Sequence, residues 1–129
     1  MRKLTALLTA LALTLGLVTP AAAENTPKSE DIVILYTNDI HSYIDKELSY
    51  DTLAALKNEM ETQYEHVFLV DAGDHVQGTA YGSMDKGNSI VELMNATGYD
   101  AATPGNHEFD YGMDGMMNVV DRAEYPYLS

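Results

Sequence analysis

Short apolar segments alternate with amphipathic segments along residues 31–129. Residues 32–36 form a continuous apolar run rich in β-branched side chains, which is typical of a strand buried on both faces. A second apolar run at residues 66–70 and a short one at 100–103 predict two further strands. Residues 125–129 indicate the start of another strand.

Three segments between the predicted strands have apolar residues at the three- and four-residue spacings of a helix. They span residues 51–64, 88–97 and 113–123. Their predicted inward faces consist, in chain order, of Leu53, Leu56 and Met60; of Ile90, Val91 and Met94; and of Met113, Met116, Met117 and Val120. Ser49 or Asp51 can cap the first helix, and Gly98 can end the second. Strands that alternate with helices predict an α/β fold with a parallel sheet.

The first 23 residues have the layout of a secretory signal peptide. Basic residues precede an apolar run at 4–18, and three alanines at 21–23 form a small-residue cleavage site. A membrane anchor is the alternative, but a spanning helix needs roughly 20 apolar residues. We therefore expect a periplasmic or extracellular protein with no stable membrane span. A polar linker over 24–30 then leads into a single domain over 31–129.

The charge balance limits the kinds of partner that the chain can bind. The sequence has 20 acidic and 7 basic residues, which gives a formal net charge of −13. Binding of DNA or RNA rests on Lys and Arg that neutralise phosphates, so a nucleic-acid polymer is disfavoured. A small phosphorylated substrate remains possible if a cation supplies positive charge locally. The absence of cysteine excludes disulfides and fits any redox compartment.

Each predicted strand is followed by a cluster of polar side chains. The clusters contain, in chain order, Asp39 and His41; Asp71 and Asp74; and Asn106, His107 and Asp110. Because parallel strands place their C-terminal ends at one edge of a sheet, we expect the clusters to converge there. In extended backbone, Asp39 and His41 would point to the same face. Gly73, Gly78 and Gly105 would let the backbone turn sharply and approach a ligand closely.

Converging carboxylates need a positive counter-charge. Neither Lys nor Arg occurs within the three clusters, and unpaired carboxylates held together are unfavourable. A divalent metal ion is the simplest solution. The mixture of imidazole, carboxylate and amide groups suits Mn, Fe, Co or Zn better than calcium.

The stretches that carry these clusters resemble the calcineurin-like metallophosphoesterases, and more narrowly their secreted 5'-nucleotidase branch with its 2',3'-cyclic-nucleotide phosphodiesterase members. The matching stretches are ILYTNDIHSYI, VDAGDHVQGT and GYDAATPGNHEFDYG. The resemblance covers residues 31–129 and implies the N-terminal part of the family's βαβ sandwich. It also implies a centre of two divalent metal ions that hydrolyses phosphate esters of nucleotides.

The resemblance assigns a role to each residue that matches the family motif. Asp39 and His41 would bind the first metal, Asp74 would bridge both, and Asn106 would bind the second. By the same resemblance, His107 faces the transferred phosphoryl group rather than a metal, and Asp110 orients His107.

Other polar residues near these motifs are assigned supporting or unrelated positions. Glu108 is expected to support the turn by accepting backbone N–H bonds. His75 is expected to point away from the site, and His66 to be solvated.

The sequence also departs from the family pattern. Family members continue beyond this point, where later strands supply further His ligands and a separate C-terminal domain holds the nucleoside. We interpret the chain as the N-terminal part of a longer enzyme or as a truncated gene product. The alternatives to a phosphoesterase are an inactive metal- or phosphate-binding remnant and a sister thiosulfohydrolase of the same family.

Overall fold

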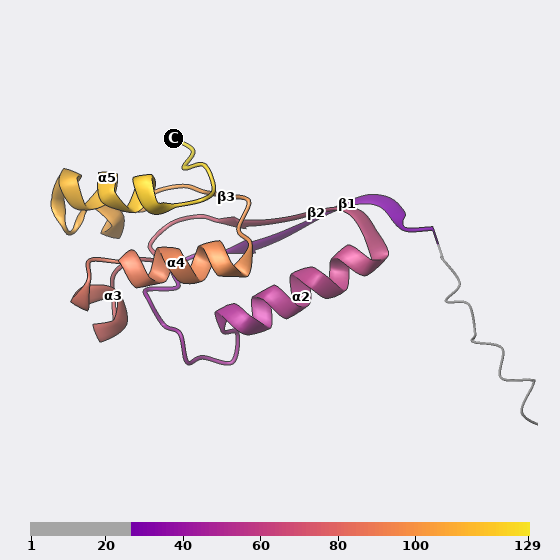
Figure 1. Cartoon of the computed structure of the whole chain (residues 1–129), viewed down its shortest axis with the longest axis horizontal. Coiled ribbons are helices and arrows are strands. Elements are labelled where there is room, and N and C mark those ends of the chain that lie inside the picture. The colour runs from indigo at the N-terminus through magenta and orange to yellow at the C-terminus, as the bar shows by residue number, and fades with distance from the viewer. Residues whose placement is uncertain (1–26) are drawn as a thin grey trace, which may run out of the picture.

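A three-stranded parallel sheet forms the centre of the molecule (Figure 1). The computed structural model describes residues 27–129, so the predicted signal peptide and the start of the predicted linker lie outside the described residues. The strands are β1 (Ser29–Thr37), β2 (Tyr64–Asp71) and β3 (Ala101–Ala102), in the order β1-β2-β3. A parallel bridge joins Ala102 to Tyr127, where the sequence predicts the start of another strand.

Helices connect the strands, as the periodicity predicts. They are α2 (Tyr50–Gln63), α3 (Ala80–Met84), α4 (Asn88–Thr97), the 3₁₀ turn η1 (His107–Phe109) and α5 (Gly112–Arg122). In Figure 1, α2 and α4 lie along the same side of the sheet, and α5 runs beside α4. The short elements α3 and η1 were not predicted, because three to five residues are too few to show a helical period. None of the helices in residues 27–129 is long and apolar enough to cross a bilayer.

The residues predicted to cap α2 and α4 lie at those helix ends. Ser49 is the N-cap residue of α2, where its carbonyl accepts the N–H of Leu53 but its side chain makes no capping hydrogen bond. Gly98 ends α4 in the left-handed conformation, with φ of 84°, and its N–H reaches the carbonyls of Met94 and Asn95. Glycine adopts this conformation without a steric penalty, so it ends α4 and lets the chain turn towards β3.

The main core lies between β2 and the helices on the covered side of the sheet. Leu69 of β2 and Ile90 and Met94 of α4 are completely buried, and tyrosines from α2, the loop after α4 and the C-terminal segment surround them. A smaller cluster of Val76, Val91 and Val119 joins α4 to α5. The two clusters hold the helices against the sheet, and so fix the positions of the loops at its C-terminal edge.

The opposite face of β1 is exposed, so the prediction that this strand is buried on both faces is wrong for the described residues. Ile32, Ile34 and Tyr36 are 66%, 62% and 76% exposed, whereas the alternate residues face the helices. Phe68 of β2 is also exposed on that side. The reason is tertiary: α2 and α4 pack on only one face of the sheet.

The inward stripe of α5 also differs from the prediction. Met116 and Val119 are buried, but Met113 and Met117 are exposed. The buried line along α5 runs through Met116 and Val119, which are three residues apart, and Val119 packs with Val76 and Val91. The face of α5 that packs in the core is therefore rotated away from Met113 and Met117.

We predict that Leu69→Ala lowers the free energy of unfolding by about 2–5 kcal/mol, because it deletes a fully buried side chain from the core. The neighbouring substitution Phe68→Ala, on the exposed face of the same strand, is expected to cost about 1 kcal/mol or less. Urea denaturation followed by circular dichroism measures both. Equal losses would contradict burial on one face only.

Candidate functional site

The loops that follow β1 and β2 run side by side at the C-terminal edge of the sheet. The backbone N–H groups of Asp39, His41 and Ser42 donate to the carbonyls of Gly73, Asp74 and His75, at 3.1, 2.9 and 2.9 Å. The loop after β3 joins them, since the N–H of His107 donates to Asp74 Oδ1 at 2.8 Å. The predicted convergence of the three polar clusters is therefore confirmed.

The backbone of these loops is left-handed rather than extended. Asp39, His41, Ser42 and Asp74 have φ angles of 54°, 50°, 53° and 58°. Such values are uncommon for residues other than glycine and cost of order 1–3 kcal/mol each unless the surroundings hold them. The prediction that extended backbone aligns Asp39 with His41 is thus wrong. Their side chains still approach each other, with 3.6 Å between His41 Nε2 and Asp39 Oδ1.

One side chain from each loop contributes to a cluster that can hold a metal ion. His41, Asp74 and His107 each present a ligand atom, and these atoms all lie within 4.8 Å of one another. The rings of His41 and His107 meet edge to face, with centroids 5.1 Å apart. Two imidazoles and a carboxylate suit a first-row divalent ion. All three residues are partly exposed, so the cluster is open to solvent.

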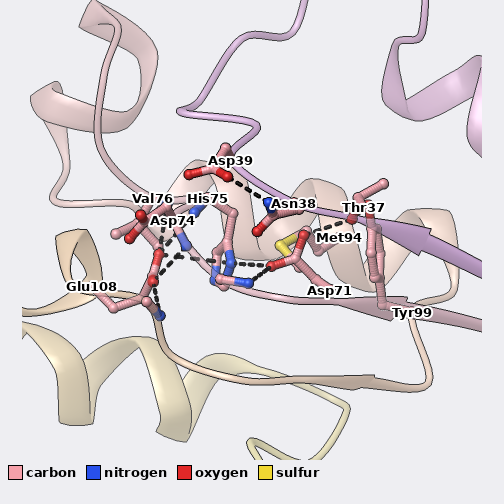
Figure 2. Close-up of polar contacts among 12 residues, drawn as sticks. Thr37, Asn38, Asp39, Asp71, Asp74, His75, Val76, Met94, Tyr99 and Glu108 are labelled. Carbon is pink, nitrogen blue, oxygen red and sulfur yellow. Dashed lines mark hydrogen bonds and ion pairs between the residues drawn. The ribbon is translucent and has the colours of Figure 1, made fainter.

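The remaining predicted ligands lie beside this cluster. Asp39 is exposed and accepts a hydrogen bond of 2.5 Å from Asn38 Nδ2, as Figure 2 shows. Asn106 is an exposed residue that immediately precedes His107 at the start of η1. The cluster thus includes His107, which the resemblance assigned to the phosphoryl group, whereas Asp39 lies outside it.

Hydrogen bonds fix the orientation of both imidazoles. His41 Nδ1 lies 3.1 Å from the carbonyl oxygen of Gln77. A donated Nδ1–H there leaves Nε2 unprotonated and available as a ligand, a common arrangement at metal sites. His107 Nδ1 lies 2.7 Å from Asp110 Oδ2, which is the pairing that the resemblance implies. No sequence signal pointed to Gln77, because it acts through its backbone carbonyl.

Glycine allows the three loops to pack backbone against backbone. A Cβ on Gly105 would lie 2.2 Å from Asp74 Oδ1, and one on Gly73 would lie 2.4 Å from the amide nitrogen of Gly105. Both distances are far shorter than a van der Waals contact. The sequence predicts close approach of a ligand at these glycines, whereas the structure shows close approach of one loop to another.

Two buried side chains, Glu108 and His75, pack behind the site loops, and Figure 2 shows both. Glu108 accepts backbone N–H bonds from both loops, as the sequence predicts. His75 points away from the cluster, also as predicted: its Nδ1 lies 2.7 Å from Asp71 Oδ1 and its Nε2 2.7 Å from the Tyr127 hydroxyl. His66 is exposed on β2 and takes no part.

Asp71 links the supporting network to the strands. Its Oδ2 accepts a hydrogen bond of 2.6 Å from Thr37 Oγ1, and its Oδ1 accepts the N–H of Gly73 at 2.8 Å. The ends of β1 and β2 are therefore tied together by a buried carboxylate. Burial raises the pKa of the neighbouring Tyr99 hydroxyl, which remains protonated and 2.9 Å from Thr37 Oγ1.

The electrostatics of the site favour a charged His107. The hydrogen bond that His107 donates to the Asp110 carboxylate raises the pKa of this imidazole above its ordinary value, and nearby Asp74 and Glu108 act in the same direction. The described residues of the three clusters include neither Lys nor Arg. His107 is therefore positioned to supply local positive charge beside the carboxylates.

Comparisons with known proteins identify relatives of the chain. Residues 32–128 match the family model described as calcineurin-like phosphoesterase. A snake venom 5'-nucleotidase from Gloydius brevicauda is 36% identical over 124 residues, which cover 84% of this chain and 21% of the relative. The 5'-nucleotidase of Bos taurus is 36% identical over 115 residues, with 77% and 20% coverage. The chain therefore spans about a fifth of the length of these relatives.

Solved structures of nucleotidases also resemble this chain over about three quarters of its length. The NAD nucleotidase of Haemophilus influenzae superposes with a TM-score of 0.69 at 29% identity, over 76% of this chain and 20% of the other. A 5'-nucleotidase precursor from Thermus thermophilus superposes with a TM-score of 0.70 at 27% identity, over 76% and 22%. The three strands and flanking helices correspond to the N-terminal part of this fold.

We predict that the pKa of His107 in the metal-free protein lies above 6.5, and that Asp110→Asn lowers it, because the substitution removes the charge that stabilises the imidazolium. An NMR titration of the imidazole protons measures both values. Since the pKa is raised in the folded state, the pair stabilises the fold below the unfolded-state pKa. That stabilisation is lost as the pH rises through the folded-state pKa.

The matched control is Asp114→Asn, which neutralises an acidic residue in the first turn of α5. It is expected to leave the His107 titration unchanged. A His107 pKa that does not respond to Asp110→Asn would refute the pairing.

We predict that Gly105→Ala weakens Mn²⁺ binding by about tenfold or more, because the new Cβ must displace the Asp74 carboxylate. The control is Gly112→Ala, where a Cβ meets nothing within 4 Å although φ is 74°. That variant is strained but leaves the cluster in place, so its affinity should stay within about twofold of wild type. Isothermal titration calorimetry compares the three proteins, and equal affinities would contradict the packing of Gly105 on Asp74.

Proposed function

This chain belongs to the calcineurin-like phosphoesterase family, and we propose that it carries the metal- and phosphoryl-binding edge of an exported, 5'-nucleotidase-like hydrolase. The proposal rests on one observation. Three loops, each following a different strand, bring His41, Asp74 and His107 within 4.8 Å of one another. Such a juxtaposition of imidazole and carboxylate groups is what a metal-assisted phosphoesterase requires.

We propose that two divalent metal ions bind at this edge, chosen from Mn, Zn, Co and Fe. Asp39 and His41 would hold the first, Asp74 would contribute to both, and Asn106 would hold the second. The donor set supports this, because it combines imidazole, carboxylate and amide groups with no competing Lys or Arg among the described site residues. When bound, such ions activate water as a nucleophile near neutral pH and neutralise charge on phosphoryl oxygens.

His107 and Asp110 form the acid of the proposed reaction. The imidazolium donates a hydrogen bond to a phosphoryl oxygen, or its proton to the leaving alkoxide. Asp110 accepts from Nδ1 at 2.7 Å, so Nε2 is the atom that faces the reaction. The raised pKa of His107 keeps the charged form populated closer to neutral pH. General acid catalysis of this kind contributes about 10²- to 10⁴-fold in rate.

The proposed substrates are small nucleotides or related phosphate esters. The relatives of this chain support this proposal, because they include 5'-nucleotidases and an NAD 5'-nucleotidase. The net charge of −13 repels extended polyanions, whereas a single phosphate can be held locally by metal ions and His107. Residues that recognise the nucleoside are expected on a separate C-terminal domain. The predicted signal peptide over residues 1–23 supports export.

A metal-binding remnant without turnover is the second candidate function. It is favoured by the size of the ligand set, since the described residues bring only three His or carboxylate groups within ligand distance of one another. Catalysis by the family chemistry needs two ions, and each needs more protein ligands than this set provides. The two candidates differ in a measurable way, because both bind metal but only one releases phosphate.

The decisive experiment measures phosphate release from AMP and from 2',3'-cyclic AMP by the protein expressed from its complete reading frame. Turnover is expected with added Mn²⁺ and is expected to be lost after chelation with EDTA. Binding of Mn²⁺ without release of phosphate would support the remnant. Absence of both would sink the assignment of the site.

We predict that Asp74→Ala loses both metal binding and turnover, whereas His107→Ala loses mainly turnover. Asp74 supplies a carboxylate to the proposed centre, so its loss should abolish both Mn²⁺ binding and turnover. His107→Ala should lower kcat by about 10²- to 10⁴-fold and retain most of the bound metal, because its role is in proton donation. Metal content is read by inductively coupled plasma mass spectrometry. Wild-type metal content in Asp74→Ala would contradict the proposed role of Asp74.

A further inference from the structure

Glu108 is a buried carboxylate whose hydrogen bonds all go to backbone amides of the site loops. The residue is 1% exposed. Its Oε1 accepts the N–H groups of His75 and Val76 at 2.8 and 3.2 Å. Its Oε2 accepts those of Asp74 and Gly105 at 2.8 and 2.6 Å, as Figure 2 shows in part. Four donors from two loops thus converge on one side chain.

The amide dipoles take the place of a counter-ion. A buried carboxylate is costly unless hydrogen bonds satisfy it, and bonds from N–H groups to a charged oxygen are about twice as strong as neutral ones. Neither Lys nor Arg contacts Glu108 in the described chain; the nearest basic group is the His75 ring, with Nδ1 3.7 Å from Oε1. That ring is already engaged by Asp71 at 2.7 Å.

The Asp74 loop and the segment 107–108 are joined by hydrogen bonds in both directions. Asp74 donates its N–H to Glu108, and Asp74 Oδ1 accepts the N–H of His107, the residue next to Glu108. Asp74 and the segment 107–108 are therefore braced reciprocally, through one backbone donor and one carboxylate acceptor on each side. This brace fixes the distance between the Asp74 carboxylate and the loop that carries Asn106 and His107.

We propose that Glu108 is a positioning residue that sets the geometry of the metal site by holding the Asp74 loop and the Asn106–His107 loop in one fixed relation. This inference rests on the proposed function, since it assigns Glu108 a role in metal binding. Both carboxylate oxygens of Glu108 are occupied by backbone N–H groups. Its effect is transmitted through the positions of Asp74 and His107.

The four backbone N–H bonds that Glu108 accepts are called the clamp below. Replacing Glu108 by its isosteric amide, glutamine, tests the clamp sharply. Each carboxylate oxygen accepts two N–H bonds. In Glu108→Gln, one of the two positions becomes an NH₂ group, which is a donor and faces two further donors. The variant must therefore release either the Asp74 and Gly105 amides or the His75 and Val76 amides. Size and shape are preserved, so the change acts on the clamp and leaves core volume unaltered.

The experiment compares Mn²⁺ binding by wild type, Glu108→Gln and the control Ile90→Val, using calorimetry together with the electron paramagnetic resonance spectrum of bound Mn²⁺. Ile90 is fully buried in α4, and as an apolar side chain it makes no hydrogen bond to the site loops; Ile90→Val removes a single methyl group from the core. We expect Glu108→Gln to weaken binding by about 10- to 100-fold and to alter the spectrum. Ile90→Val should lower the melting temperature while affinity and spectrum stay as in wild type.

The outcomes separate this inference from the function on which it rests. Equal affinities and spectra in Glu108→Gln and wild type would overturn the positioning role and leave the proposed metal centre intact. A parallel loss of affinity in Ile90→Val would also overturn it, because general destabilisation would then explain the effect. If wild type itself binds no Mn²⁺, both proposals fail together.

A measurement on the wild-type protein covers the case in which Glu108→Gln does not fold. The clamped amides of Asp74, His75 and Gly105 lie in loops, yet the clamp predicts slow hydrogen exchange at rates like those of β2 amides. The control is the amide of Asp45 in the loop before α2, which has no hydrogen bond in the described structure. Exchange of the clamped amides as fast as that of Asp45 would overturn the proposal.

Discussion

The short ladder of backbone hydrogen bonds between the loop after β1 and the loop after β2 is the constraint on which the site depends. The N–H groups of Asp39, His41 and Ser42 reach carbonyls of residues 73–75, and they do so only because the donor residues have positive φ. Each left-handed residue is unfavourable by itself, but the ladder and the buried carboxylates hold it in place. The side chains that emerge from these residues therefore have directions that ordinary extended or helical backbone could not give them.

Two buried carboxylates, Asp71 and Glu108, support the site loops, and each holds a different part of them. Asp71 ties the ends of the strands together through Thr37 and the N–H of Gly73, and it also fixes the His75 ring. Glu108 accepts backbone N–H groups from the loops that follow β2 and β3. Neither carboxylate is solvated, so two negative charges lie directly behind a site that already contains acidic groups. The arrangement increases the demand for positive charge at the open edge of the sheet, where His107 and a bound cation can supply it.

Much of the architecture could be predicted from the sequence because it depends on local periodicity and on topology. Apolar runs located β1 and β2, helical spacing located α2, α4 and α5, and the position of polar residues after each strand led to one common edge. The predictions failed where packing of neighbouring elements decides which side chains are buried. Whether Ile34 or Met117 is buried depends on which face a helix covers, and local pattern does not record that. Likewise, Asp39 and His41 carry no signal for positive φ, because the ladder that requires it joins residues more than 30 positions apart.

The origin of the proposed ligands His41, Asp74 and Asn106 in three separate loops has a thermodynamic consequence. Ions held by these residues would fasten segments that are adjacent only in the native state, while the unfolded chain offers no comparable site. By mass action, free cation at 100 times its dissociation constant would then add about 2.7 kcal/mol to stability. The melting temperature would then depend on the concentration of free cation around the protein. Its durability would be set in part by the mineral content of its surroundings.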